Sequence, residues 1–96
     1  MTTWFISRHQ GAIDWIKQKQ IQIDRFEAHL DVDQVQADDI VIGTLPIHLA
    51  AKVCEKGAKF IFLAVNISEQ QRGTELSVIE LNQQDCQLIP FYIQII

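Results

Sequence analysis

The sequence predicts an α/β fold in which helices cover both sides of a mainly parallel sheet. Residues 3–7, 39–42 and 59–65 are short runs of β-branched, aliphatic and aromatic residues, and the first and last of these read as strands buried on both faces. Apolar residues with helical spacing follow the runs at 3–7 and 39–42. A strand followed at once by a helix is the opening of a βαβ unit, in which the two strands are parallel.

The first half of the chain contains three predicted strands and one helix. The strand at 3–7 is followed by a helix whose apolar positions begin at Ala12 and which fades in the polar stretch 17–20. Apolar and polar residues alternate over 23–30, as in a strand with one wetter face. The third strand follows at 39–42, so this half has the order β-α-β-β.

The second half opens with a helix. Pro46 fits its first turn, where a missing N–H is tolerated, and Gly57 ends it. The remaining predicted elements are a strand over 59–65, a polar loop over 66–74, a weaker helix over 77–83 and a last strand over 88–96. Pro90 indicates that this last strand is an edge strand or is bent. The whole order predicts one domain, residues 1–96, with a Rossmann-like α/β sandwich fold.

Composition and charge narrow the classes of function. The 96 residues suffice for one domain, and a formal net charge of -4 argues against binding of long DNA or RNA, which usually leaves a basic footprint. Charged or polar residues interrupt every apolar run, and the N-terminus lacks the pattern of a signal peptide. Cys54 and Cys86 have no metal-ligand spacing, which favours buried free thiols. We therefore expect a cytoplasmic protein that binds neither long nucleic acid nor a membrane.

Two turns that follow predicted strands carry polar residues suited to a ligand site. They are 7–11, with the sequence Ser-Arg-His-Gln-Gly, and 43–46, Gly-Thr-Leu-Pro, with His48 inside the helix that follows. Open α/β sheets bind ligands at the C-terminal ends of their strands, where the free N–H groups of helix N-termini favour anions. If the two strands are neighbours, these residues form one phosphate-binding rim. The loop containing Arg72 and Glu75 follows the fourth strand and could close over it.

Each of these residues also has a purely structural explanation. Ser7 and Thr44 are residue types that commonly cap the helices that follow them. Arg8 could be a surface residue paired with an acid, which would contribute little to stability. His48 could be a partly buried helix residue, and the two charged residues of the later loop could pair only with each other. Residue type and spacing alone leave these alternatives open.

Motifs for several other chemistries are absent from the sequence. There is no GxGxxG after the first strand and no GxxxxGK[ST], so dinucleotide and P-loop sites are not indicated. No GxSxG elbow and no paired cysteine and histidine point to a hydrolase of those types. The residues by themselves predict an anion or nucleotide site on a small α/β domain.

Four segments resemble a known family. They are WFISRHQG at 4–11, AHLD at 28–31, IGTLPIHLAA at 42–51 and RGTEL at 72–76. The first and third of these at this separation form a specific combination, similar to the short CRISPR-associated ring nucleases that accompany type III CRISPR systems. The resemblance implies a fold related to cyclic-oligoadenylate-binding domains. It also implies an enzyme that cleaves a cyclic oligoadenylate, cyclic tetra-adenylate above all, to linear products and so switches off type III signalling.

The resemblance also implies roles for the rim residues. Arg8 would bind the phosphate and neutralise its charge, Ser7 would orient it, and His9 or a second histidine would transfer protons. The substrate-binding residues would be Gly11, Gly43, Thr44, Leu45, Pro46, His48, Arg72 and Glu75. The ring's own 2′-hydroxyl would attack, so no metal and no cofactor are expected. The two-fold symmetry of cyclic tetra-adenylate favours a homodimer.

Two other functions stay open at this point. The same rim could bind and sequester the cyclic oligoadenylate without aligning an attack, which would make the protein a binding module. The chain could also be a dimerisation domain that has no ligand. An assay that resolves bound, cleaved and free ring separates all three functions.

Overall fold

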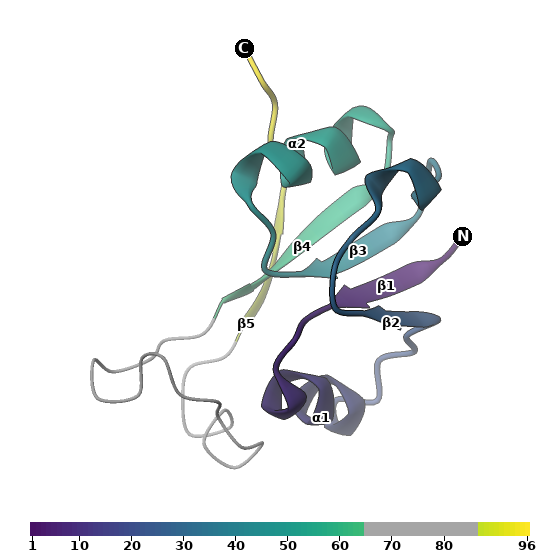
Figure 1. The fold of residues 1–96 in the computed structure, drawn as a ribbon, viewed down its shortest axis with the longest axis vertical. Helices are drawn as coiled ribbons and strands as arrows, with labels where there is room; N and C mark the ends of the chain where they lie inside the picture. The colour runs from purple at the N-terminus through teal and green to yellow at the C-terminus, as the bar shows by residue number, and fades with distance from the viewer. Residues whose placement is uncertain (65–86) are drawn as a thin grey trace, which may run out of the picture.

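The computed structural model describes residues 1–64 and 87–96 (Figure 1). The elements in chain order are β1 (Thr3–Ile6), α1 (Gln10–Gln18), β2 (Arg25–Glu27), the short 3-10 helix η1 (Val32–Gln34), β3 (Ile40–Gly43), α2 (Ile47–Glu55), β4 (Lys59–Ala64) and β5 (Gln87–Phe91). Apart from η1, this is the predicted order of elements. The predicted loop over 66–74 and helix over 77–83 lie outside the described residues, as does Cys86.

The described strands form one sheet with the order β2-β1-β3-β4-β5. The pairs β1–β2, β1–β3 and β3–β4 are parallel, whereas β5 runs antiparallel to β4. The prediction of a mainly parallel sheet is therefore confirmed, and β5 makes the sheet mixed.

The two α-helices lie over opposite faces of this sheet (Figure 1). Successive side chains of a strand point to opposite faces. Phe5 of β1 accordingly belongs to a buried cluster with Trp15 of α1, while its neighbour Trp4 belongs to a second cluster with Val53 of α2. Each helix has nine residues, and no helix of the described part is long and apolar enough to cross a membrane.

Two strands are shorter than the sequence predicts. Of the alternating stretch 23–30, only the three residues of β2 pair, because β2 is the outer strand next to β1 and the chain then turns towards η1. The last strand, predicted over 88–96, ends at Phe91. Beyond it, the backbone N–H of Ile93 donates to the buried free thiol of Cys54 at 3.4 Å, so the chain leaves the sheet and lies against α2.

β4 is less buried than predicted, because the sequence predicted a strand covered on both faces. Phe60 and Leu63 are buried, but Ile61 and Phe62 are only half-buried and Lys59 is exposed. The central strands β1 and β3 each bury three of their four residues. The difference follows from position in the sheet, because β4 lies beside the edge strand β5.

Candidate functional site

The turns that follow β1 and β3 start from adjacent positions at one edge of the sheet. The two strands are parallel neighbours, and their last residues, Ile6 and Gly43, pair with each other. From there α1 leads to β2 on one side, and α2 leads to β4 on the other. Open α/β sheets bind ligands where successive connections diverge in this way. The structure thus brings together Ser7 and Thr44, the residues that directly follow β1 and β3.

Gly43 allows this close approach of the two strand ends. Its φ is +154°, a backbone conformation that residues with a side chain rarely adopt. A Cβ atom at this position would collide with the carbonyl oxygen of Ile6 on the neighbouring strand. The predicted site residue Gly43 is therefore explained by backbone geometry.

Ser7 shapes the first turn. Its backbone N–H donates to the carbonyl of Glu27 at 3.0 Å, and its Oγ accepts a hydrogen bond from the N–H of His9 at 3.1 Å. The N-cap residue of α1 is His9, which makes no side-chain capping bond. Ser7 does not cap α1, as one alternative supposed, but it fixes the turn that positions His9 and Arg8.

The second turn is tied to β4. The Thr44 hydroxyl donates to the carbonyl of Leu63 at 3.4 Å, so it does not cap α2 either. The N-cap residue of α2 is Pro46, whose carbonyl accepts from the N–H groups of Leu49 and Ala50. The prediction placed Pro46 inside the first turn, and the structure places it one position earlier. The N–H groups that begin α2 have no side-chain cap, which leaves them available to an anion.

The two arginines near the ends of β1 and β2 differ sharply in their contacts. Arg25 donates to Gln34 at 2.9 Å and to Glu27 at 3.0 Å, and it stacks on the Trp4 ring at 4.2 Å. Arg8 is exposed, and it makes no hydrogen bond or ion pair with any residue of the described ranges. The surface ion pair that was the structural alternative for Arg8 is therefore absent among residues 1–64 and 87–96. As far as the described residues go, the Arg8 guanidinium has no partner that would compete with an anion.

The other predicted site residues are distributed as follows. His9 and His48 are exposed at the starts of α1 and α2, so the alternative of a partly buried His48 is wrong. Gly11 is buried in the first turn of α1. Arg72 and Glu75 lie outside the described residues, so their place relative to the rim stays a prediction.

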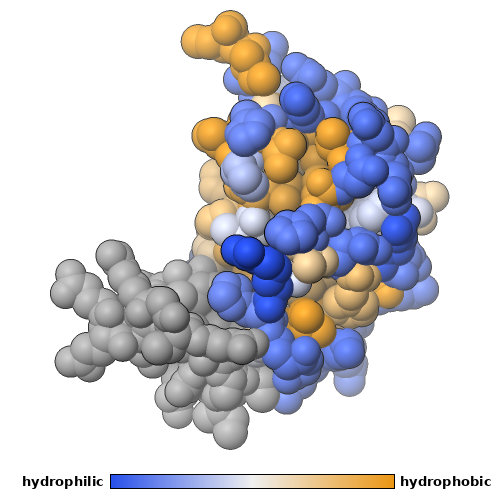
Figure 2. Space-filling model, in the orientation of Figure 1, coloured by the Kyte–Doolittle hydropathy of each residue, from blue (hydrophilic) through white to orange (hydrophobic). Residues whose placement is uncertain are grey.

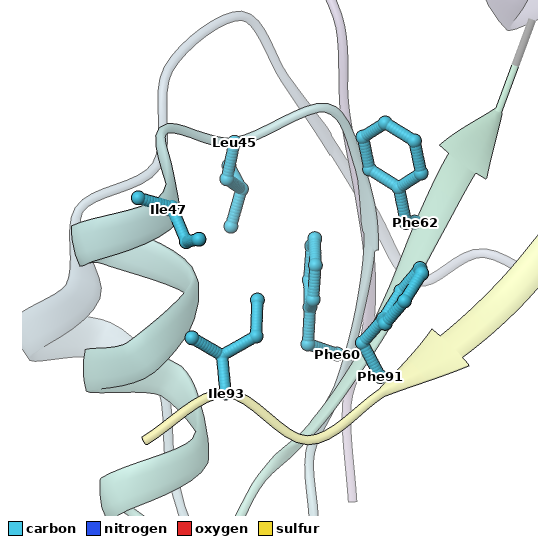
Figure 3. A pocket seen from close by; sticks show the side chains of 6 residues that line it. All are labelled: Leu45, Ile47, Phe60, Phe62, Phe91 and Ile93. Atoms are coloured by element: carbon cyan, nitrogen blue, oxygen red, sulfur yellow. The ribbon is translucent and has the colours of Figure 1, made fainter. Parts of the chain in front are cut away.

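An apolar pocket beside the second turn was missed by the sequence analysis (Figure 3). It has a volume of about 310 Å³ and is lined by Leu45, Ile47, Phe60, Phe62, Phe91 and Ile93. Phe62 and Phe91 meet edge to face with their ring centroids 6.0 Å apart. Leu45, a predicted substrate-binding residue, belongs to this pocket. The sequence predicted that β4 is buried on both faces, and the half-buried Phe62 that lines this pocket was therefore not expected.

Asp39 occupies the opposite end of the sheet from the rim. Its carboxylate accepts hydrogen bonds from Thr2 N at 2.9 Å, Gln36 N at 2.9 Å and Trp4 Nε1 at 3.2 Å, and the residue is only 3% exposed. Burial alone would raise the pKa of this carboxyl, but the three hydrogen bonds outweigh it and hold the pKa below its ordinary value of 3.8. Asp39 is therefore an ionised structural anchor.

The described residues contain no group of three or more His, Cys, Asp or Glu side chains that could hold a metal ion. Asp38 and Asp39 directly precede β3, so these two acids lie at the N-terminal end of that strand and not at the rim. Within residues 1–64 and 87–96, the rim offers an incoming group the unpaired Arg8 guanidinium, two exposed imidazoles and the backbone N–H groups of two helix starts. This set suits a phosphate.

Comparison with known protein families gives a match over almost the whole chain. A family model described as "Putative CRISPR-associated protein (Cas_VVA1548)" matches residues 4–94. No curated protein and no solved structure matches the chain. The matched range contains both turns of the rim and the pocket residues.

Proposed function

We propose, from the premise that the chain belongs to this CRISPR-associated family, that it is a ring nuclease for cyclic oligoadenylates, with cyclic tetra-adenylate as the substrate. The observation that carries the proposal is the pairing of Ile6 with Gly43, which joins two helix-start turns into one rim. The rim presents Arg8 without a partner among the described residues. Such a local cluster reconciles an anionic ligand with a chain whose net charge is -4.

The fold supports the same proposal. The strand order β2-β1-β3-β4-β5, with helices on opposite faces, fits a Rossmann-like sandwich related to cyclic-oligoadenylate-binding domains. The divergence of the chain after β1 and β3 supports this part of the proposal, because open α/β sheets take ligands where successive connections diverge. We propose that the protein acts in the cytoplasm, where a type III complex would make the ring.

The cleavage step uses the ring's own chemistry. The 2′-oxygen of one adenosine attacks the adjacent phosphorus, the new O2′–P bond forms and the P–O5′ bond breaks. A rim histidine, His9 or His48, takes the proton of the 2′-hydroxyl, and the leaving 5′-oxygen receives a proton from the other or from water. One such attack opens the ring to linear tetra-adenylate, and a second attack at the opposite phosphate gives two linear di-adenylates, each with a 2′,3′-cyclic phosphate at one end.

Arg8 and the helix-start amides supply the charge stabilisation for this step. Negative charge builds on the non-bridging oxygens as the fifth bond to phosphorus forms, and preorganised donors stabilise it most strongly. Ser7 keeps Arg8 and His9 in place, because its Oγ already accepts from the His9 N–H. No step calls for a metal ion or a cofactor.

The experiment that tests the proposal incubates the purified protein with radiolabelled cyclic tetra-adenylate and resolves bound, cleaved and free ring. We expect linear products with cyclic-phosphate ends. Retention of intact ring would instead identify a sequestering protein, and absence of both would leave a ligand-free dimerisation domain. Linear tetra-adenylate is the matched control, since it has the same bases without the ring.

A homodimer is part of the proposal. Cyclic tetra-adenylate has two-fold symmetry and four phosphates, so two rims related by a two-fold axis would contact it equivalently. Light scattering that gives the mass of two chains, with one ring bound per two chains, supports this part. A stable monomer with one ring per chain contradicts it.

A further inference from the structure

The connection from β2 to η1 starts at the same edge of the sheet as the rim. β1 and β2 are parallel neighbours, and Ile6 at the end of β1 pairs with Glu27 at the end of β2. The N–H of Ser7 donates to the carbonyl of Glu27 at 3.0 Å, which ties the first turn of the rim to this connection. His29 lies two positions beyond Glu27. The segment 28–31, for which the family resemblance implied no role, therefore begins beside the rim.

The chain then continues along the face of the sheet that α2 covers. Leu30 packs against the buried cluster of that face, to which Ile6 belongs and against which Leu45 of the second turn also packs. Figure 1 shows the connection running from the end of β2 to η1, which lies against α2. Figure 2 shows hydrophilic side chains on the surface beside the ends of β1 and β2 as drawn in Figure 1. His29 is thus held between the strand end at Glu27 and the packed side chain of Leu30.

The polar side chains around this segment fix its backbone without using His29. Arg25 bridges the two ends of the connection, since it donates to Glu27 at 3.0 Å and to Gln34 of η1 at 2.9 Å. Gln34 donates in turn to Asp31 at 3.3 Å, and the Asp31 side chain also caps η1. Both acids that flank His29 are therefore engaged with other groups. His29 itself is exposed and makes no hydrogen bond or ion pair with any residue of 1–64 and 87–96.

Histidines and lysines lie at opposite ends of the described sheet. The chain has three histidines, and each follows the C-terminal end of a different parallel strand: His29 follows β2, His9 follows β1 and His48 follows β3. The lysines of the described residues are at the ends of the two α-helices or at the start of β4, namely Lys17, Lys19, Lys52, Lys56 and Lys59. A histidine gains or loses its charge between about pH 5 and 8. Imidazoles are thus the groups that can add to the charge of Arg8 at the rim.

We infer that His29 is a third histidine of the rim and donates a charge-assisted hydrogen bond to a phosphate bound there. That this phosphate belongs to a cyclic oligoadenylate rests on the proposed function. β1 lies between β2 and β3, and neighbouring strands are about 4.8 Å apart. A phosphate held by Arg8 over the end of β1 therefore has His29 on the β2 side and His48 on the β3 side. Its two non-bridging oxygens can accept from both sides at once.

The inference is tested by titrating the full chain with inorganic phosphate while the imidazole signals of the three histidines are followed by NMR. The titration is run at about pH 6, where imidazoles carry charge, and sodium chloride keeps the ionic strength constant. We expect the His29 signals to shift with the same dissociation constant as those of His9 and His48. His29→Gln should weaken phosphate binding roughly 10-fold, as loss of one hydrogen bond between charged groups does.

Two further variants separate a role in binding from a general effect of charge. His29→Lys keeps a cationic donor and should bind phosphate nearly as tightly as the wild type. Lys59→Gln is the matched control, because it removes an exposed cation at the opposite end of the parallel strands and should leave the affinity unchanged. Both positions are exposed, so all three variants should melt at the wild-type temperature.

Four results would overturn the inference. They are a titration that moves no imidazole signal, one that moves the other histidines but not His29, wild-type affinity in His29→Gln, and an equal loss of affinity in Lys59→Gln. The ring assay is read separately. Phosphate bound through His29 by a protein that neither binds nor cleaves cyclic tetra-adenylate would sink the proposed function and leave the inference standing. Ring cleavage with unchanged KM in a His29→Gln variant that also binds phosphate normally would do the reverse.

Discussion

The two ends of β1 and β3 use polar residues in opposite ways. At the N-terminal end, Asp39 is 3% exposed, and its carboxylate accepts from two donors of the N-terminal segment and from one in the turn before β3. At the C-terminal end, Ser7 and Thr44 close their turns, while Arg8 and the histidines beside them stay exposed. One end thus holds its charge in hydrogen bonds within the fold, and the other presents charge to the solvent.

This difference separates stability from recognition along the same pair of strands. Removing a buried acceptor leaves its donors without partners, which is costly to the folded state. Removing an exposed cation without partners costs the fold little and takes away only what it could bind. Substitutions at the two ends should therefore separate cleanly in two measurements, the free energy of unfolding and the rate of ring cleavage.

The largest effect is expected for Arg8→Ala. If Arg8 stabilises the charge that builds on the phosphate, its loss should slow ring cleavage by roughly 100- to 1,000-fold, as loss of one such donor does elsewhere. The free energy of unfolding should stay at the wild-type value. Single-turnover cleavage of labelled ring and urea unfolding measure the two quantities.

Lys59→Ala is the matched control for Arg8→Ala. Lys59 is also an exposed cation, but it begins β4 and therefore lies at the N-terminal end of the parallel strands. The variant should cleave at the wild-type rate. Equal losses in the two variants would mean that overall charge and not the rim governs activity, and wild-type cleavage by Arg8→Ala would remove Arg8 from the site.

The converse result is expected for Asp39→Asn. The amide has nearly the shape of the carboxylate but has lost the charge that the three donors contact, so the free energy of unfolding should fall by about 2–3 kcal/mol. Urea unfolding measures this loss. Below the unfolding temperature the variant should cleave the ring at the wild-type rate, because Asp39 lies far from the rim. A variant that is stable but inactive would contradict the separation of the two ends.

Gly43→Ala should affect both stability and cleavage, because Gly43 allows the close approach of β1 and β3 at the rim. The new Cβ would collide with the Ile6 carbonyl in a backbone conformation unsuited to alanine, at a cost of roughly 1–3 kcal/mol. Gly57→Ala is the control, since Gly57 has a φ of +85° but only ordinary van der Waals neighbours. Thermal melts should show the larger loss for Gly43→Ala, together with slower cleavage, because the turns of the rim are pushed apart. Equal melting temperatures would mean that the collision relaxes freely.

Acid should reduce the contribution that the Asp39 carboxylate makes to the free energy of unfolding. The pKa of Asp39 is lower in the folded chain than its ordinary value, so its contribution is complete above about pH 4 and is lost as the pH falls through the folded pKa. The difference in free energy of unfolding between wild type and Asp39→Asn should therefore shrink from pH 7 to pH 3. Urea titrations at both values measure it. A difference that grew on acidification would show that the folded carboxyl is held protonated instead.

The central strands and both helices follow from local sequence. Short apolar runs followed by helical spacing are sufficient for β1, β3 and the helices after them, because burial in the middle of a sheet needs apolar residues on both faces. The extents of the edge strands β2 and β5 do not follow from local sequence. The early end of β5 depends on the contact between Ile93 and Cys54, which are 39 positions apart. Contacts at such separations leave no periodic signal in the sequence.

The rim and the pocket show the same contrast. Ser7, Arg8 and Thr44 could be grouped in advance, because a general rule places ligands at the ends of neighbouring parallel strands. The pocket could not be foreseen, since it joins Leu45, Phe60 and Phe91 from three elements whose adjacency depends on the strand order. The anchoring role of Asp39 likewise depends on donors from β1 and from the turn before β3.

The smallest effect is expected for removal of divalent metal. Attack by the ring's own 2′-hydroxyl needs charge stabilisation, which a guanidinium and helix-start amides can supply, whereas activation of a water molecule normally calls for a bound cation or a strong base. The one buried acid of the described residues, Asp39, is occupied at the far end of the sheet. Cleavage should therefore proceed at the same rate in EDTA as in magnesium chloride, and mass spectrometry should find cyclic-phosphate ends in both. If EDTA abolished cleavage and manganese restored it, attack by the 2′-hydroxyl without a metal would be wrong, and Glu75 with a rim histidine would become the leading candidate for a metal site.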